Sequence, residues 1–335
     1  MATVIQARDL RGERTERLID AVPLPAPWTL FLEPTNSCNF RCQYCPTGHT
    51  DLLQKIGRKN TLMKWELFEK IVDDLKKFPR KLKRINLYKD GESTLHPHFC
   101  DMVSQLKNAN VTESIWLKTN GSTLKPSFNK KLVDCGLDML GISVQGSTAQ
   151  AFYDIAGVKI DYEKYRANVL DLFERSRGKL PISIKVADYG QGKGEIQKFL
   201  DDFSDRCDYI TVEGLHGWSS SDTYDWKLGT NNSFDGSPRT EKIACPLVLY
   251  MLTINSNGDI SICNDDFRHA HQIGNANDMG LVEIWNGQRL KGFRLMHLEG
   301  RRSENVACAT CDYLQALPDR IDDEREIYAE RLRNG

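Results

Sequence analysis

The sequence contains no apolar run that approaches the roughly 18 residues needed to cross a membrane. Residues 1–23, MATVIQARDLRGERTERLIDAVP, are charged throughout and lack the apolar core of a signal peptide. The chain also lacks an excess of charge, because 45 basic and 46 acidic residues leave a formal net charge of -1. These absences predict a cytoplasmic protein that binds neither membranes nor nucleic acid.

Internal repeats and low-complexity tracts are absent as well, and the 335 residues allow one large α/β domain or two domains. The chain does contain a regular alternation of short apolar runs and amphipathic patterns. Strands are expected at 28–35, 84–91, 114–121, 139–146, 182–190 and 208–214, with helices near 63–78, 98–107, 128–135 and 195–203. This order predicts an α/β fold with a parallel sheet, a barrel or partial barrel, whose chemistry lies at the carboxyl ends of the strands.

The pattern changes after residue 214. Residues 215–243 are polar, rich in Ser, Gly and Asn, and without periodicity, so they form either an ordered connection with functional loops or a flexible linker. Two alternating runs then flank Asn257-Gly258 within 250–265, which predicts a β-hairpin. The C-terminal segment 319–335 is expected to be an exposed, charged helix.

Three of the ten cysteines, Cys38, Cys42 and Cys45, lie close together in TNSCNFRCQYCP. A structural zinc site needs four ligands, and a disulfide framework needs an even number of cysteines in an oxidising compartment. Three clustered thiols in a reduced compartment therefore indicate a metal centre that is open on one side. A zinc knuckle completed by His49, or thiols that serve only packing, are the alternatives.

The CxxxCxxC spacing, with Tyr44 directly before the third cysteine, resembles the signature of the radical S-adenosylmethionine (SAM) superfamily. The resemblance implies a partial (β/α)6 barrel in which the three thiolates hold three irons of a [4Fe–4S] cluster. Thiolates are the ligands that such clusters require. The fourth iron is then left for the amino and carboxylate groups of SAM.

A second stretch, KDGESTLHPHF (89–99), resembles the glycine-glycine-glutamate segment of the same superfamily, which contacts the SAM amino group. Gly91 and Glu92 match this segment, whereas Asp90 replaces the first glycine and Ser93 the usual proline, which leaves the local backbone open. The family pattern adds Thr119, Asn120, Ser143 and Lys185 as candidate SAM contacts, and Lys185 suits the SAM carboxylate best. Each of these four could instead be an ordinary structural polar residue.

Four further cysteines, Cys245, Cys263, Cys308 and Cys311, resemble the auxiliary-cluster domain of the SPASM and Twitch subfamilies. A full SPASM domain has seven cysteines, so four imply the shorter Twitch form with one fully ligated auxiliary [4Fe–4S] cluster. A zinc-binding interaction module would use the same four ligands. The predicted organisation is an N-terminal extension (1–25), the partial barrel (26–214), the polar connection (215–243), the auxiliary-cluster domain (244–318) and the charged helix (319–335).

The resemblance implies reductive cleavage of SAM to a 5′-deoxyadenosyl radical, which removes a hydrogen atom from the substrate. A flavodoxin- or ferredoxin-type protein would supply the electron. The auxiliary cysteines resemble those of the Twitch-type dehydrogenase that oxidises an aminocyclitol alcohol, 2-deoxy-scyllo-inosamine. We therefore expect a radical SAM oxidoreductase that converts a secondary alcohol of a small polyol, a sugar or aminocyclitol, to a ketone.

Other reactions stay open, namely those of a radical epimerase, a dehydratase or a peptide-modifying maturase. Peptide-modifying relatives usually carry a leader-binding domain, for which the short N-terminal segment is expected to leave no room. Within the polar connection, Trp218, Tyr224 and Trp226 could stack on a carbohydrate or simply fix the loop to the barrel. The spare cysteines Cys100, Cys135 and Cys207 are expected to be buried, inert thiols away from the barrel mouth. An epimerase would need such a thiol in its pocket.

Overall fold

The computed structural model describes residues 3–4, 16–215, 238–311, 313–317 and 319–334. Its centre is a sheet of ten strands in the order β1-β7-β6-β5-β4-β3-β2-β8-β9-β10. Every pair from β1 to β8 is parallel, and β9 and β10 add two antiparallel pairings. The strands are β1 (Thr3–Val4), β2 (Thr29–Leu32), β3 (Arg84–Asn86), β4 (Ile115–Thr119), β5 (Met139–Val144), β6 (Ile182–Asp188), β7 (Tyr209–Gly214), β8 (Met251–Ile254), β9 (Asp259–Ser261) and β10 (Gln272–Asn275).

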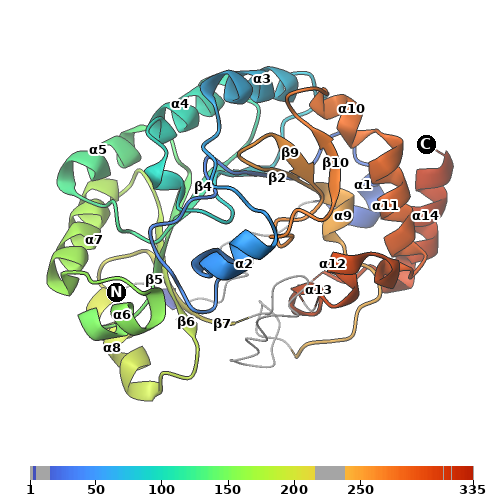
Figure 1. Ribbon diagram of the computed structural model, residues 1–335. Coiled ribbons are helices and arrows are strands. Elements are labelled where there is room, and N and C mark those ends of the chain that lie inside the picture. Colours follow the sequence, from blue (N-terminus) through green and yellow to red (C-terminus); the bar gives the residue numbers. More distant parts are fainter. Residues whose placement is uncertain (1–2, 5–15, 216–237, 312, 318, 335) are drawn as a thin grey trace.

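Helices cover the convex side of the parallel strands as an outer arc (Figure 1). They are α3 (Trp65–Leu75), α4 (Phe99–Ala109), α5 (Pro126–Asp134), α6 (Ala149–Ala156), α7 (Tyr162–Ser176) and α8 (Lys193–Phe203). The buried face of α3 is apolar at the three-to-four spacing that the sequence shows, with Phe68 and Ile71 fully buried. The expected α/β architecture with a partial barrel is therefore confirmed.

Alternation along the strands separates the core from the barrel interior. Ile142, Ile184 and Ile210 have no exposed surface, as expected for side chains packed under the helices. Their neighbours Ser143 and Lys185 pair in register on the opposite face of the sheet. The inner face therefore carries polar groups toward the carboxyl ends of β5 and β6.

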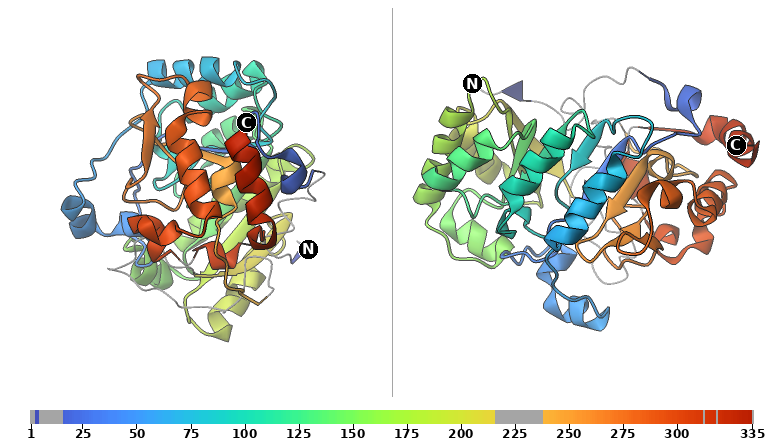
Figure 2. Two further views of the ribbon diagram at one scale, coloured as in Figure 1. Left: turned by 90° about the vertical axis from the view of Figure 1, so that its right-hand side faces the viewer. Right: turned by 90° about the horizontal axis from the view of Figure 1, so that it is seen from above.

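The N-terminal segment contributes structure that the sequence did not predict. Strand β1 pairs with β7 and extends the parallel sheet at its edge. Helix α1 (Leu18–Ala21) buries Leu18 and Ile19. The short helix α2 (Thr50–Lys55) follows the first cysteine cluster and stands out from the body of the molecule in both views of Figure 2.

The C-terminal part continues the barrel sheet, because β8 pairs in parallel with β2. The predicted hairpin forms between β8 and β9, and Gly258 in its turn has φ +93°, a conformation that favours glycine. Helices α9 (Leu247–Tyr250), α10 (Leu281–Trp285), α11 (Gln288–Leu298), α12 (Val306–Ala309), α13 (Tyr313–Ala316) and α14 (Arg325–Asn334) complete this part.

Helix α14 is not simply exposed, as its charged sequence had suggested. It buries Tyr328, Ala329 and Leu332 and packs along α11. Its apolar residues recur at helical spacing and are masked in the sequence by the charges between them. Among the described helices, none is long and apolar enough to cross a membrane.

Candidate functional site

The first site is the loop between β2 and α2 that carries Cys38, Cys42 and Cys45. Backbone hydrogen bonds fold it tightly, since the Cys45 amide donates to the Cys42 carbonyl oxygen at 3.1 Å. Burial raises the pKa of all three thiols, and the mutual charge repulsion of the cysteines raises the pKa of Cys42 further. Three partly buried sulfurs that repel one another as thiolates fit a site that a cationic metal cluster would neutralise.

His49 does not complete this cluster as the fourth ligand of a zinc knuckle in the observed geometry. Its Nε2 atom lies 2.6 Å from the carbonyl oxygen of Gln43 and is engaged with the backbone. In this geometry, His49 Nε2 is therefore not directed at the three cysteines.

Gly91 brings the second predicted segment directly against the cysteine loop. A Cβ atom at this position would lie 2.7 Å from the Asn36 carbonyl carbon and from the Ser37 oxygen, and closer still to the carbonyl oxygen of Thr35. The next amide, that of Glu92, donates to the Ser37 oxygen at 2.9 Å. Only glycine allows this approach of two backbones, which places Glu92 beside the cysteines.

Glu92 is 3% exposed and accepts hydrogen bonds on both carboxylate oxygens. Thr94 donates to Oε1 from its amide at 3.1 Å and its hydroxyl at 2.6 Å, and the Thr119 hydroxyl donates to the same oxygen at 2.8 Å. The Asn120 amide donates to Oε2 at 2.7 Å. Burial raises the pKa of Glu92, and these donors oppose that effect by favouring the carboxylate.

Thr119 and Asn120, predicted as SAM contacts, thus orient Glu92 in this structure. The side-chain amide of Asn120 also donates to Asn39 Oδ1 at 3.0 Å and lies 3.9 Å from Cys38 Sγ. The end of β4 therefore links the Glu92 segment to the cysteine loop.

Two polar pairs occupy the neighbouring strand ends. The Tyr44 hydroxyl donates to Gln145 Oε1, and the Gln145 amide donates to the carbonyl oxygen of Ser143 at 3.0 Å. Lys185 Nζ lies 2.5 Å from Glu213 Oε2. Burial lowers the pKa of Lys185, while Glu213 opposes this shift. Gln145 and Glu213 were not predicted, because no local pattern distinguishes them from other polar residues near strand ends.

The departure from the family pattern at Asp90 is explained by a buried charge network. Asp90 Oδ2 lies 2.6 Å from both Arg58 Nη2 and Lys89 Nζ. Arg58 also lies 3.7 Å from Glu33 Oε1, and each of these four side chains is at most 7% exposed. Burial alone would raise the pKa of Asp90, but Arg58 and Lys89 hold it well below its usual range.

This network joins the barrel to the C-terminal part of the chain. Glu33 Oε2 accepts hydrogen bonds from the amide of Ser256 at 3.1 Å and from its hydroxyl at 3.0 Å. Arg58 Nη1 donates to the Phe267 carbonyl oxygen at 3.1 Å. The segment before Gly91 is thereby held to the hairpin and to the loop that follows Cys263.

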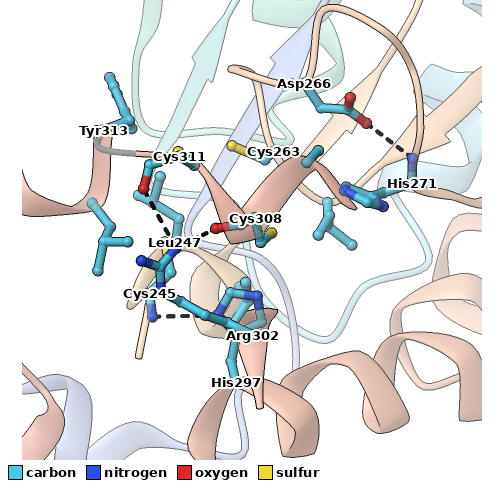
Figure 3. Close-up of a pocket in the computed structure, with 14 residues that line it drawn as sticks. Cys245, Leu247, Cys263, Asp266, His271, His297, Arg302, Cys308, Cys311 and Tyr313 are labelled. Atoms are coloured by element: carbon cyan, nitrogen blue, oxygen red, sulfur yellow. Dashed lines mark hydrogen bonds between the residues drawn. The ribbon is translucent and has the colours of Figure 1, made fainter. Parts of the chain in front are cut away.

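The second site is a pocket lined by Cys245, Cys263, Cys308 and Cys311, which come from three segments of the C-terminal part (Figure 3). Arg302 donates to the Cys308 carbonyl oxygen and, at 3.4 Å, to that of Cys311, so it fixes the CxxC turn. Burial raises the pKa of Cys245 to about 11 and of Cys308 to about 12.

Asp265 adds negative charge to this pocket. Its amide donates to Cys263 Sγ at 3.3 Å, and its Oδ2 lies 3.8 Å from Cys311 Sγ. The Nε2 atoms of His271 and His297, which also line the pocket, are buried and have no hydrogen-bond partner among the described residues. Four thiols around one pocket and two unpaired nitrogens fit a thiolate-ligated iron–sulfur cluster that accepts hydrogen bonds.

Comparison with known families identifies the fold that carries these sites. The radical SAM superfamily matches residues 32–202, just over half of the chain. The chain belongs to the radical SAM superfamily. A second match, to the SPASM iron–sulfur cluster-binding domain, covers residues 245–312. Membership brings a [4Fe–4S] cluster and SAM to the barrel and an iron–sulfur cluster to the SPASM domain, so these predictions are confirmed.

Two curated relatives match parts of the chain. The tungsten-containing aldehyde ferredoxin oxidoreductase cofactor-modifying protein of Pyrococcus furiosus is 36% identical over 115 residues, covering 34% of this chain and 30% of that protein. GTP 3′,8-cyclase of Edwardsiella ictaluri is 26% identical over 176 residues, covering 51% of this chain and 50% of the relative. The chain thus spans half or less of the length of these relatives.

Solved structures resemble the chain over most of its length. BtrN in complex with AdoMet and 2-DOIA gives a TM-score of 0.54 at 16% identity and covers 85% of this chain and 92% of BtrN. SuiB of Streptococcus suis bound to S-adenosylmethionine gives 0.61 at 17% identity over 87% and 72% of the two chains. For anSMEcpe with bound AdoMet the TM-score is 0.61 at 16% identity, over 92% and 94%. At these identities the likeness shows the fold.

The remaining predicted residues fall into two groups. Trp218, Tyr224 and Trp226 lie outside the described residues. The three spare thiols belong to the outer layer. Cys135 and Cys207 are buried and donate to the carbonyl oxygens of Leu132 and Phe203, while half-buried Cys100 on α4 is hydrogen-bonded to Cys135.

Proposed function

We propose that this radical SAM enzyme oxidises a secondary alcohol of a small polyhydroxylated molecule, a sugar or aminocyclitol, to a ketone. When bound, the SAM-binding cluster and SAM supply a radical that removes a hydrogen atom from the substrate, and the auxiliary cluster supplies a one-electron acceptor. A flavodoxin- or ferredoxin-type protein is the proposed electron donor. The chain's own residues bind the cofactors, orient the substrate and take up the alcohol proton.

The distribution of the ten cysteines carries this proposal. All ten are among the described residues, and seven of them gather at the two sites. The other three lie in the outer layer and hydrogen-bond to helix carbonyl oxygens or to each other. Oxidation needs no thiol at the barrel mouth, whereas an epimerase that returns a hydrogen atom from a cysteine does.

Each cofactor has a proposed set of residues. Cys38, Cys42 and Cys45 would hold the SAM-binding cluster, and Cys245, Cys263, Cys308 and Cys311 the auxiliary cluster. The buried Glu92 carboxylate suits the SAM ammonium, because Thr94, Thr119 and the Asn120 amide already fix its position. Tyr44, Gly91, Ser143 and Lys185 complete the proposed SAM site.

The Lys185–Glu213 pair supplies a group that can accept the substrate proton. Its atoms lie 2.5 Å apart on the inner face of β6 and β7, and both side chains keep some exposed surface, 29% and 19%. Lys185 Nζ donates to Glu213 Oε2, so Lys185 is the charged partner and the Glu213 carboxylate is the group that can accept a proton. Loss of the alcohol proton to this pair would accompany ketone formation.

The likeness to BtrN supports a small-molecule substrate, since the structure of BtrN was determined in complex with 2-DOIA. The structure of SuiB, in contrast, was also determined with a bound precursor peptide. The decisive experiment is incubation of anaerobically reconstituted protein with candidate polyols, followed by mass spectrometry. We expect a product lighter than its substrate by two hydrogen atoms and one SAM consumed per product.

Substitution of the spare thiols separates oxidation from epimerisation. Cys100→Ala, Cys135→Ala and Cys207→Ala should each retain turnover, apart from losses of packing. A product of unchanged mass, or a spare-thiol variant that still abstracts hydrogen but no longer turns over, would replace oxidation by epimerisation.

A further inference from the structure

Two histidines of the four-cysteine pocket have a feature that no ligand assignment explains. His271 and His297 are 8% and 1% exposed, and both line the pocket with the cysteines (Figure 3). The Nε2 atom of each ring is buried and has no hydrogen-bond partner among the described residues. A buried nitrogen without a partner costs free energy on the order of 1–3 kcal/mol, so two of them in one pocket require an explanation.

The hydrogen bond at the other nitrogen of His297 fixes where its proton lies. The backbone amide of Cys245 donates to His297 Nδ1 at 3.4 Å. Because an amide nitrogen can only donate, Nδ1 is the acceptor and carries no proton. The neutral ring must then carry its proton on Nε2, so the unpaired atom is an N–H donor.

The same reasoning applies to His271 through Asn305. Asn305 Oδ1 accepts hydrogen bonds from the amides of Ala307 and Cys308 at 3.2 and 3.1 Å, at the start of α12. This fixes the orientation of the Asn305 side chain, so its Nδ2 donates to His271 Nδ1 at 2.9 Å. The proton of His271 therefore also lies on Nε2, as an unpaired N–H.

Both rings are held in place by aromatic packing. The ring of Phe293 lies between them, with centroids 5.5 Å from His271 and 4.9 Å from His297. Together with the bonds at Nδ1, this packing leaves the imidazoles little freedom to turn their Nε2 atoms toward other acceptors. The acceptors that the pocket would hold are the thiolate and sulfide sulfurs of the auxiliary cluster.

We propose that His271 and His297 each donate a hydrogen bond from Nε2–H to a sulfur of the auxiliary cluster and thereby raise its reduction potential. Reduction adds one negative charge to the cluster, and hydrogen bonds to the sulfurs stabilise that charge. Asp265 acts in the opposite direction, because its carboxylate lies 3.8 Å from Cys311 Sγ. By stabilising the reduced state, the two histidines make the cluster a better electron acceptor.

The test is a potentiometric titration, followed by electron paramagnetic resonance, in full-length protein that lacks Cys38, Cys42 and Cys45, so that only the auxiliary cluster titrates. His271→Phe and His297→Phe keep an aromatic ring without a donor, and His271→Gln and His297→Gln keep an N–H donor. We expect each Phe variant to shift the reduction equilibrium at least tenfold toward the oxidised cluster, about 59 mV for one electron. The Gln variants, which keep a donor, should have a reduction potential close to that of the parent protein.

His98→Phe is the matched control, because His98 is exposed at the start of α4 and does not line the pocket. Its potential should equal that of the parent protein. Unchanged potentials in the Phe variants at full iron content would overturn the proposal, and so would equal shifts in the Phe and Gln variants.

A second measurement keeps both histidines, so it still tests the proposal if the variants fail to assemble the cluster. Protein labelled with 15N at histidine should show 15N hyperfine coupling to the reduced auxiliary cluster, since a hydrogen bond carries spin density onto the donor nitrogen. Absence of such coupling in otherwise unchanged protein would overturn the proposal. The inference rests on the auxiliary cluster and not on alcohol oxidation, so the titration and the product assay can fail independently.

Discussion

The two cysteine sites differ in how the chain builds them. The three-cysteine loop is one continuous segment, pressed against the backbone at Gly91, and it lies beside the polar groups at the ends of β4 and β5. The four-cysteine pocket is assembled from segments as far apart as Cys245 and Cys311, and its lining includes Leu247, Val248 and Leu314. One site is arranged to receive a second ligand, and the other to enclose its cluster.

Removal of cysteines should have the largest effect. We expect about eight irons per chain in anaerobically purified protein, if both sites hold [4Fe–4S] clusters. Cys42→Ala should lower the iron content by about half and abolish SAM cleavage, because three thiolates are the minimum that the open site offers. Cys263→Ala should lose a similar amount of iron but keep SAM cleavage.

Cys207→Ala is the control, because its sulfur donates only to a helix carbonyl oxygen, and its iron content should equal that of the unchanged protein. Stoichiometric zinc in the four-cysteine pocket of natively purified protein would contradict the claim that this pocket holds an iron–sulfur cluster.

The charge network around Asp90 should contribute next, because it holds the first site to the second. Asp90→Asn leaves Arg58 and Lys89 buried with one partner fewer, which should lower the free energy of unfolding by about 3–5 kcal/mol. Asp73→Asn breaks a surface pair with Lys76 and should change it by less than about 1 kcal/mol. Anaerobic denaturant titrations measure both, and equal effects would mean that the network does not hold the two parts together.

The pH dependence of the same network has a defined sign. Arg58 and Lys89 outweigh the effect of burial and keep the folded-state pKa of Asp90 below its value of about 3.9 in an unfolded chain. Its stabilisation is therefore fully present above about pH 4 and is lost as the pH falls toward the folded-state pKa. The Asn variant should lack this acid-dependent loss.

Glu92→Gln sharpens the contrast further, since it should affect SAM binding and leave both clusters assembled. Loss of a charged acceptor for the SAM ammonium should cost about 1.5–3 kcal/mol, or ten- to a hundredfold in affinity. Glu113→Gln, at an exposed position, is the control. Isothermal titration measures the SAM affinity of both variants. An unchanged affinity of Glu92→Gln would mean that the segment around Asp90 does not contact the cofactor.

The smallest effect concerns backbone packing at the first site. Gly91→Ala places a methyl group against the backbone of residues 35–37 and should destabilise the loop by about 1–3 kcal/mol. Gly194→Ala, in α8 with open space around it, should instead stabilise the protein by about 0.4–1 kcal/mol. Thermal unfolding separates the two, and a neutral Gly91→Ala would contradict the close approach.

Local signals were sufficient to predict the barrel strands and the open site. Apolar runs marked β2 to β7, and the three cysteines follow the first of them in one short stretch. The parallel pairing of β8 with β2 has no local signal, because the hairpin sequence specifies only its own turn. The charged segment around α14 also concealed the residues that it buries.

Contacts between distant segments explain the rest of what the sequence did not reveal. Asp90 was recognised as a departure from the family pattern, but its partner Arg58 lies beyond α2, and Ser256, which binds Glu33, lies far along the chain. The unpaired nitrogens of His271 and His297 exist only because folding places both rings around four cysteines.

The central claim is that the three-cysteine site binds SAM and the four-cysteine pocket does not. Electron paramagnetic resonance of the reduced protein, recorded with and without SAM, tests it most directly in the two single-site variants. Cys263→Ala retains the first site, and we predict that its spectrum changes when SAM is added. Cys42→Ala retains the second site, and we predict that its spectrum stays the same. A SAM-dependent change in Cys42→Ala, or none in Cys263→Ala, would contradict the account.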